Sequence, residues 1–149
     1  MLKLNLPVYE FKIIRQKEAL KIFDIYRKCY VKLTPEEWVR QNFLRYLTEV
    51  KKVPVSHIKT EGALHLNDLK KRTDAVVFDK EFVPAVLIEF KAPDVLLSEK
   101  VFEQINIYSM VVAARYVVVT NGMTHYYAKS GGSGQRVEFI NDLPEYCNL

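Results

Sequence analysis

The stretch TDAVVFDKEFVPAVLIEFK, residues 73–91, decides the fold. Two apolar runs, 75–78 and 85–88, flank a short polar connection, which predicts a β-hairpin. Strands this apolar are expected to be buried, and a buried carboxylate or ammonium group is costly unless it is paired, hydrogen-bonded or bound to a metal. Asp74 opens the first run, and Glu89 and Lys91 close the second, so three charged groups need an explanation.

The pairing of the two strands decides whether these charged side chains meet. Glu89 and Lys91 are two residues apart and project from the same face of their strand. If Asp79 faces Pro84, paired positions sum to 163, and Asp74 lies across from Glu89 with Cβ atoms about 4.5–5.5 Å apart. Two carboxylates that close predict a divalent metal between them, with a lysine beside it. A one-residue slip would separate them, and Lys91 could also merely neutralise one carboxylate at the strand end.

Length and composition fit a globular protein. The 149 residues give 17.4 kDa, and the apolar share of 49% and charged share of 27% are ordinary values. The net charge of +4 favours an anionic partner only mildly. Lys70-Lys71-Arg72, just before the hairpin, suits either a phosphate-backbone ligand or a solvated turn.

Several classes of protein are disfavoured. Cys29 and Cys147 are too few and too far apart for a disulfide framework or a zinc motif. No apolar stretch approaches the ~18 residues of a membrane span, and no export signal is visible. We therefore expect a cytoplasmic location and no membrane partner. No P-loop and no Gly-x-Gly-x-x-Gly motif appears, which disfavours a nucleotide-driven motor and a Rossmann cofactor site.

A single domain is expected over residues 1–149. It comprises an N-terminal extension (1–33) packed on the core, a core (34–129) and a C-terminal tail (130–149). Within the extension, strands are expected at 11–15 and 26–33, and the segment between them is ambiguous.

Thr34-Pro35-Glu36-Glu37 predicts the start of a helix. Thr34 can cap it, Pro35 suits the first position, and Glu37 can complete a capping box. Apolar residues at helical spacing extend the helix to about Lys51. The centre of this apolar stripe lies about 30° from Glu36 and about 130° from Glu37 on a helical wheel. Glu36 is therefore expected to point toward the core.

The remaining elements complete the order helix, three strands, helix, two strands. A strand is expected at 55–60, a second helix at about 98–114, and two strands at 116–120 and 124–129 joined by a turn at Asn121-Gly122. One more short strand is expected in the tail. The order predicts an α/β (α+β) fold with a central mixed sheet flanked by helices.

Five motifs stand in an order that matches a known family. They are TPEEWVRQ (34–41), RTD (72–74), IEFKAP (88–93), Gln104-x-x-x-Tyr108 and Thr120-Asn121-Gly122. Over about residues 30–129 they resemble the N-terminal nuclease domain of type I restriction enzyme R subunits, in the PD-(D/E)xK nuclease superfamily. The resemblance implies a restriction-endonuclease-like fold of αβββαββ order. It departs in two respects: R subunits carry a helicase motor that this sequence lacks, and Thr73 stands where the superfamily label has proline.

The resemblance also implies a site. Asp74 and Glu89 would bind the metal together with the carbonyl of Phe90, and Lys91 would be the catalytic lysine. Oxygen ligands favour Mg²⁺ or Mn²⁺ over zinc. The implied activity is metal-dependent endonuclease hydrolysis of phosphodiester bonds in DNA.

Three further residues are candidates from the two helices. Gln104 and Tyr108 match an element that lies beside the active site in that family, and one helical turn apart they share a face. Tyr108 could equally be a core residue. Glu36 is the candidate for the acid that some superfamily members add from the first helix, or a first-turn acid favoured by the helix dipole.

Two functions stay open. The first is a metal-dependent deoxyribonuclease. The alternative is a non-catalytic module that retains the nuclease fold and binds nucleic acid or protein. The expected partners are DNA, a motor or specificity subunit on another chain, and, since superfamily nucleases often dimerise, a second copy of this chain.

Overall fold

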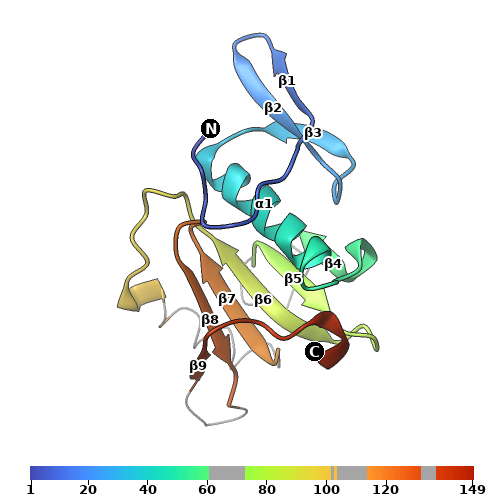
Figure 1. The fold of residues 1–149 in the computed structure, drawn as a ribbon, viewed down its shortest axis with the longest axis vertical. Helices are drawn as coiled ribbons and strands as arrows, with labels where there is room; N and C mark the ends of the chain where they lie inside the picture. Colours follow the sequence, from blue (N-terminus) through green and yellow to red (C-terminus); the bar gives the residue numbers. More distant parts are fainter. Residues whose placement is uncertain (61–72, 102, 104–113, 132–136) are drawn as a thin grey trace, which may run out of the picture.

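The computed structural model describes residues 1–60, 73–101, 103, 114–131 and 137–149. Its described part consists mainly of two β-sheets and one long α-helix, α1 (Pro35–Glu49) (Figure 1). A three-stranded sheet stands off to one side, and a six-stranded sheet forms the body. The expected α/β (α+β) class with a central mixed sheet is confirmed.

The six-stranded sheet has the order β4-β5-β6-β7-β8-β9. Its neighbours are antiparallel except β6 and β7, which are parallel and need a crossover connection. The second helix was expected in that crossover, and residues 99–101 and 103 are helical; its remainder lies outside the described residues. The strands are β4 (Ile58–Thr60), β5 (Ala75–Phe78), β6 (Pro84–Phe90), β7 (Tyr116–Thr120), β8 (His125–Lys129) and β9 (Glu138–Ile140).

The hairpin of β5 and β6 has the expected register over its buried part. Ala75 pairs with Ile88, and the next two pairs keep the same sum of 163. The expected connection was wrong, because Phe78, not Asp79, pairs with Pro84. A register shift after the third pair absorbs the difference. Asp79 instead stabilises the turn, where its side chain accepts two backbone N–H bonds at 3.0 and 2.9 Å.

Both faces of the central strands are covered. On one face, α1 packs against the sheet, with the Phe43 and Phe90 rings edge to face at 6.0 Å. Along β6 the side chains alternate: Val86 and Ile88 join this cluster, whereas Leu87 joins the cluster on the opposite face. Strands buried on both faces are continuously apolar, as in 75–78 and 85–88.

The first turn of α1 differs from the expectation for its two glutamates. Thr34 caps the helix, accepting the Glu37 N–H at 3.1 Å. Glu37, expected to face away from the core, is buried at 7% exposure, whereas Glu36 is half-buried. The apolar stripe of α1 could not reveal this, because the N-terminal sheet covers the Glu37 side.

The N-terminal extension forms a sheet of its own, projecting from the body at the top of Figure 1. Its antiparallel strands are β1 (Ile13–Gln16), β2 (Ala19–Asp24) and β3 (Cys29–Lys32). The two expected strands are present with shifted ends, and the ambiguous segment is the central strand. The extension does pack on the core: Leu4 joins the main cluster, and the Asn5 N–H donates to the Gly122 carbonyl at 2.8 Å.

Two smaller expectations are corrected or confirmed. Residues 55–57 form a 3-10 turn, Val55–His57, so only the second half of the expected 55–60 strand is β4. The short strand expected in the tail is β9.

Both cysteines are free and exposed. In the described ranges, no helix has the length and apolarity needed to cross a membrane.

Candidate functional site

The charged end of the hairpin lies where β5 begins and β6 ends. Asp74 Oδ2 accepts a hydrogen bond from the Phe90 N–H at 2.7 Å, which holds this carboxylate against the end of β6. The N–H and C=O of one strand residue point to the same side of the strand, so the Phe90 carbonyl is directed toward Asp74 as well. On the other side, the Lys91 N–H donates to the Thr120 carbonyl at 2.9 Å and ties the chain to β7.

Glu89 and Lys91 meet directly beside this bond. Lys91 Nζ lies 2.6 Å from Glu89 Oε1, as their spacing on one strand face predicts. The two side chains are 28% and 22% exposed, so the pair is half-buried and open to solvent. This contact also agrees with the alternative interpretation, in which Lys91 only neutralises the Glu89 carboxylate.

The position of Asp74 relative to Glu89 follows from the ends of the two strands. Glu89 is two residues beyond Leu87 and therefore shares its face, the one opposite α1. The paired register ends at Ala75 and Ile88, so Asp74 lies in a bend one residue before β5, where one further pair would set it across from Glu89.

A third carboxylate reaches this site from α1. Burial raises the pKa of Glu36, the charge of Asp74 raises it further, and the charge of Lys91 lowers it. Glu36 thus interacts electrostatically with both Asp74 and Lys91, and its role as an added acid of the site stays a prediction.

Repulsion among these acids is visible in the pKa of Glu89. Burial raises that pKa, the charges of Asp74 and Glu36 raise it further, and Lys91 acts in the opposite direction. For Lys91, burial alone lowers the pKa, but its bond to Glu89 and the nearby acids raise it overall. Among the described residues, three carboxylates therefore interact with one ammonium group at this site, and the charges of the acids raise the pKa of Glu89.

The donor set can be compared with the needs of a metal. Among the residues that the structure describes, no group of three or more His, Cys, Asp and Glu side chains gathers as metal ligands. The oxygens available are the carboxylates of Asp74 and Glu89 and the carbonyl of Phe90. This set fits Mg²⁺ or Mn²⁺, which bind through one or two carboxylates and keep several waters.

Two candidate residues cannot be placed. Gln104 and Tyr108 lie outside the described residues, as does the basic run Lys70-Lys71-Arg72. Their expected position beside the site stays a prediction.

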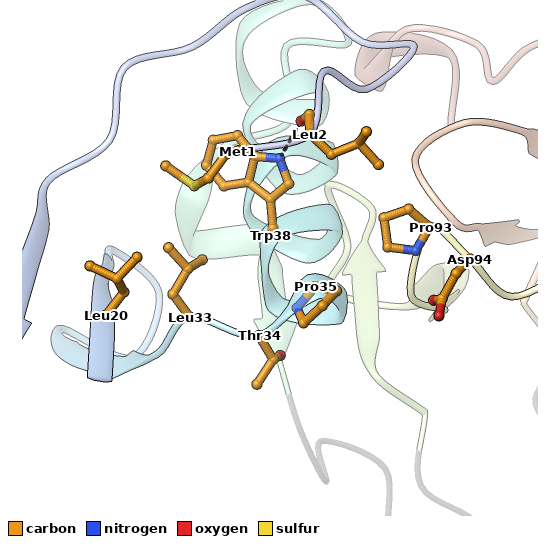
Figure 2. A pocket seen from close by; sticks show the side chains of 9 residues that line it. All are labelled: Met1, Leu2, Leu20, Leu33, Thr34, Pro35, Trp38, Pro93 and Asp94. Atoms are coloured by element: carbon orange, nitrogen blue, oxygen red, sulfur yellow. Dashed lines mark hydrogen bonds between the residues drawn. The ribbon is translucent and has the colours of Figure 1, made fainter. Parts of the chain in front are cut away.

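An apolar pocket of about 510 Å³ lies between the N-terminal region, the start of α1 and the loop after β6. Figure 2 shows Leu20 and Leu33 of the N-terminal region on one side and Pro93 and Asp94 on the other. Pro35 on its floor directly precedes Glu36, and Pro93 lies two residues beyond Lys91. The pocket therefore lies between the three-stranded sheet and the segment that follows Lys91. Its remaining lining residues are Met1, Leu2, Thr34 and Trp38.

Neither this pocket nor a buried charged cluster around Glu37 was predicted from the sequence. Trp38 is only partly buried and donates from Nε1 to the Leu2 carbonyl at 3.0 Å. Glu37, interpreted as part of a capping box, lies 3.4 Å from Arg40 and 3.6 Å from Arg27. The spacing of Glu37 and Arg40, three residues apart on a helix, was a usable signal for the second feature.

Comparison with known proteins identifies a family for most of the chain. Residues 35–144 match the family model described as the type I restriction enzyme R protein N terminus. No curated protein and no solved structure matches the chain. The matched segment contains all the candidate site residues and begins after the three-stranded sheet.

Proposed function

The chain belongs to the type I restriction enzyme R protein N-terminal family, a restriction-enzyme-related nuclease domain, and from this premise we propose that it is a metal-dependent deoxyribonuclease. Its substrate would be DNA and its reaction the hydrolysis of phosphodiester bonds. One observation carries the proposal. The hydrogen bond from the Phe90 N–H holds the Asp74 carboxylate at the end of β6, which also bears the bonded pair Glu89 and Lys91.

Asp74, Glu89 and the Phe90 carbonyl would hold Mg²⁺ or Mn²⁺. The effect of Asp74 on the pKa of Glu89 supports this assignment, since a divalent cation between the two carboxylates would offset their repulsion. When bound, the ion would lower the pKa of a water and stabilise charge on the phosphate. Metal binding by these three groups is the pattern of the PD-(D/E)xK superfamily, and membership of that superfamily is part of the proposal.

Lys91 would act as a charged hydrogen-bond donor. Its Nζ is held at 2.6 Å from Glu89, so the ammonium group is fixed at the end of β6 and half-exposed to a substrate. In that position it would orient the attacking water and offset negative charge that develops in the transition state. Glu36 would add a further acceptor from α1, and Gln104 and Tyr108 would contact the phosphate or water.

One observation favours the second function, a binding module without catalysis. The Glu89–Lys91 pair neutralises itself at 2.6 Å and needs no metal to be satisfied. If this pair is purely structural, the fold would serve to bind nucleic acid or protein alone.

Cleavage of supercoiled plasmid tests the proposal. We expect nicking in Mg²⁺ or Mn²⁺ that EDTA abolishes, and a loss of at least about 10²-fold in rate for Asp74→Ala and for Lys91→Ala. Glu81→Ala, which removes an exposed acid in the β5–β6 turn, is the matched control and should keep full activity. Nicking that survives in both site variants would refute the assignment of these residues.

Titration with Mn²⁺ separates the two functions when no cleavage is seen. Under the nuclease proposal, wild-type protein and Lys91→Ala bind Mn²⁺, whereas Asp74→Ala binds it much more weakly, because only the last variant loses a ligand. A folded protein with neither nicking nor Mn²⁺ binding would favour the binding module instead.

A further inference from the structure

The positive charge of the chain is concentrated in the three-stranded sheet. Residues 12–32 contain seven Lys and Arg residues and two acids, a net charge of +5, while the whole chain has +4. The rest of the chain therefore has a net charge of −1. This segment lies before the part matched by the family model, so the proposed nuclease site does not account for it.

The strand register sorts these residues onto two faces. Ile22, fully buried, faces the body together with its partners Ile13 and Val31. The residues that alternate with them form the outer face. We define this outer face by six side chains: Lys12, Ile14, Lys21, Phe23, Tyr30 and Lys32. At one end it borders α1, because Lys12 and Phe23 line a small pocket with Arg45.

Two lysines of the outer face lie directly opposite each other. Lys21 of β2 pairs with Lys32 of β3, and like charges in opposed positions destabilise a sheet. The described residues provide neither of these ammonium groups, nor that of Lys12, with an ion-pair partner. An arrangement that costs stability in the free protein would be relieved by an anion bound across the strands.

The turns add two more lysines in unusual conformations. Lys17, between β1 and β2, has φ 54°, and Lys28, between β2 and β3, has φ 55°. Glycine or asparagine is normally preferred at such positions, because a side chain at positive φ is strained. Both ends of the sheet therefore have a lysine at a turn position where glycine or asparagine would cause less backbone strain.

The aromatic pair on this face indicates which form of nucleic acid fits. The Phe23 and Tyr30 rings pack edge to face at 5.2 Å, so they contact each other instead of presenting parallel faces for base stacking. The groups of this face that suit nucleic acid are therefore the lysines, which bind backbone phosphates without reading sequence.

We propose that the outer face of β1–β3 binds the phosphate backbone of duplex DNA that flanks the cleavage site. The inference rests on the proposed function in taking DNA as the substrate. Leu20 and Leu33, on the inner side of the same sheet, line the pocket that ends at Pro93, two residues beyond Lys91. The sheet and this pocket thus lie between the outer face and the segment that follows Lys91, so the outer face would be a flanking contact and not part of the reaction centre.

Binding of a fluorescent duplex, measured by anisotropy in EDTA over a range of salt concentrations, tests the proposal. We expect Lys21→Ala/Lys32→Ala to raise Kd about tenfold and to reduce the salt slope by about 2, since each lost phosphate contact removes about one counterion. Lys21→Arg/Lys32→Arg should bind as tightly as wild type. Lys80→Ala/Lys129→Ala, which removes two exposed lysines of the body, is the charge-matched control and should leave the slope nearly unchanged.

A single substitution separates binding from folding. Lys32→Glu places an opposite charge across from Lys21, so it should raise Tm slightly while weakening duplex binding about tenfold. If Lys32 had a merely structural role, the substitution would change Tm and the affinity for duplex in the same direction.

The outcomes distinguish this proposal from the nuclease proposal. Duplex binding that is unchanged in the sheet variants overturns the outer face as a DNA contact and leaves the nuclease site untouched. Preference for a single strand, lost in Tyr30→Ala, also overturns it in favour of base stacking. Sheet-dependent binding together with no cleavage under any metal would support the surface and refute the nuclease.

Discussion

The two sheets accommodate charge in opposite ways. In the six-stranded sheet, two close ion pairs lie at strand ends and turns: Arg115 is 2.7 Å from Asp79, and Lys91 is 2.6 Å from Glu89. In the three-stranded sheet, lysines face solvent, and two of them oppose each other. The difference follows from burial, since a strand covered on both faces admits a charge only with a partner, whereas an exposed face does not require one.

A buried charged cluster joins the two regions. Asp24 of β2 is fully buried and accepts the N–H groups of Tyr26 and Arg27. The Arg27 guanidinium contacts Asp24 at 3.1 Å and Glu37 of α1 at 3.6 Å. The sheet rich in exposed charge is therefore held to the body by charges that are satisfied within the protein.

Breaking this joint should have the largest effect on stability. Glu37→Ala would remove the buried carboxylate that contacts the guanidinium groups of Arg27 and Arg40 and should lower the free energy of unfolding by about 3 kcal/mol. Glu36→Gln, one residue earlier and half-buried, is the matched control and should change stability by less than about 1 kcal/mol. Urea denaturation of both variants measures the contrast, and equal losses would contradict the separate roles of the two glutamates.

Removing an isoleucine from each sheet compares the two regions directly. Ile88→Ala, at 1% exposure in the central strand β6, should cost about 3 kcal/mol through lost burial and a cavity. Ile14→Ala, at 39% exposure on the outer face, should cost less than about 1 kcal/mol. Chemical denaturation gives both values, and a large cost at Ile14 would mean that the outer face is covered in solution.

The smallest effect concerns the charge at the β5–β6 turn. The Val83 N–H bond, with Arg115 and the Glu81 N–H, lowers the pKa of Asp79. Because the folded pKa lies below the unfolded one, this carboxylate stabilises the fold above the unfolded pKa, and the stabilisation is lost as pH falls through the folded pKa.

Asp79→Asn should therefore destabilise the protein by about 1–2 kcal/mol at neutral pH, the usual loss for a hydrogen bond to a charged group. The difference from wild type should shrink below about pH 4, near the ordinary pKa of an aspartate. Melting curves of both proteins across that range measure it, and a constant difference down to acid pH would speak against the charge as its source.

Much of the body was predictable because its signals are local. The Thr34 cap, the strand of residues 116–120 and the hairpin register all agree with the sequence analysis. The register survived a wrong assumption about the turn, because the buried face of an apolar strand fixes pairing more strongly than the connection does. The assignment of Asp74, Glu89 and Lys91 to a nuclease site stays a prediction, though their proximity is now described.

The sequence alone determined the family resemblance, the buried hairpin and the residues that its ends carry, because apolar periodicity, caps and motifs act over a few residues. Only the tertiary structure showed that β2 completes a separate basic sheet, that Glu37 is buried among arginines, and that a pocket separates this sheet from the loop after Lys91. Each of these depends on contacts between segments far apart in the chain. Periodicity within one segment indicates that it has a face to bury, but not which distant segment will cover it.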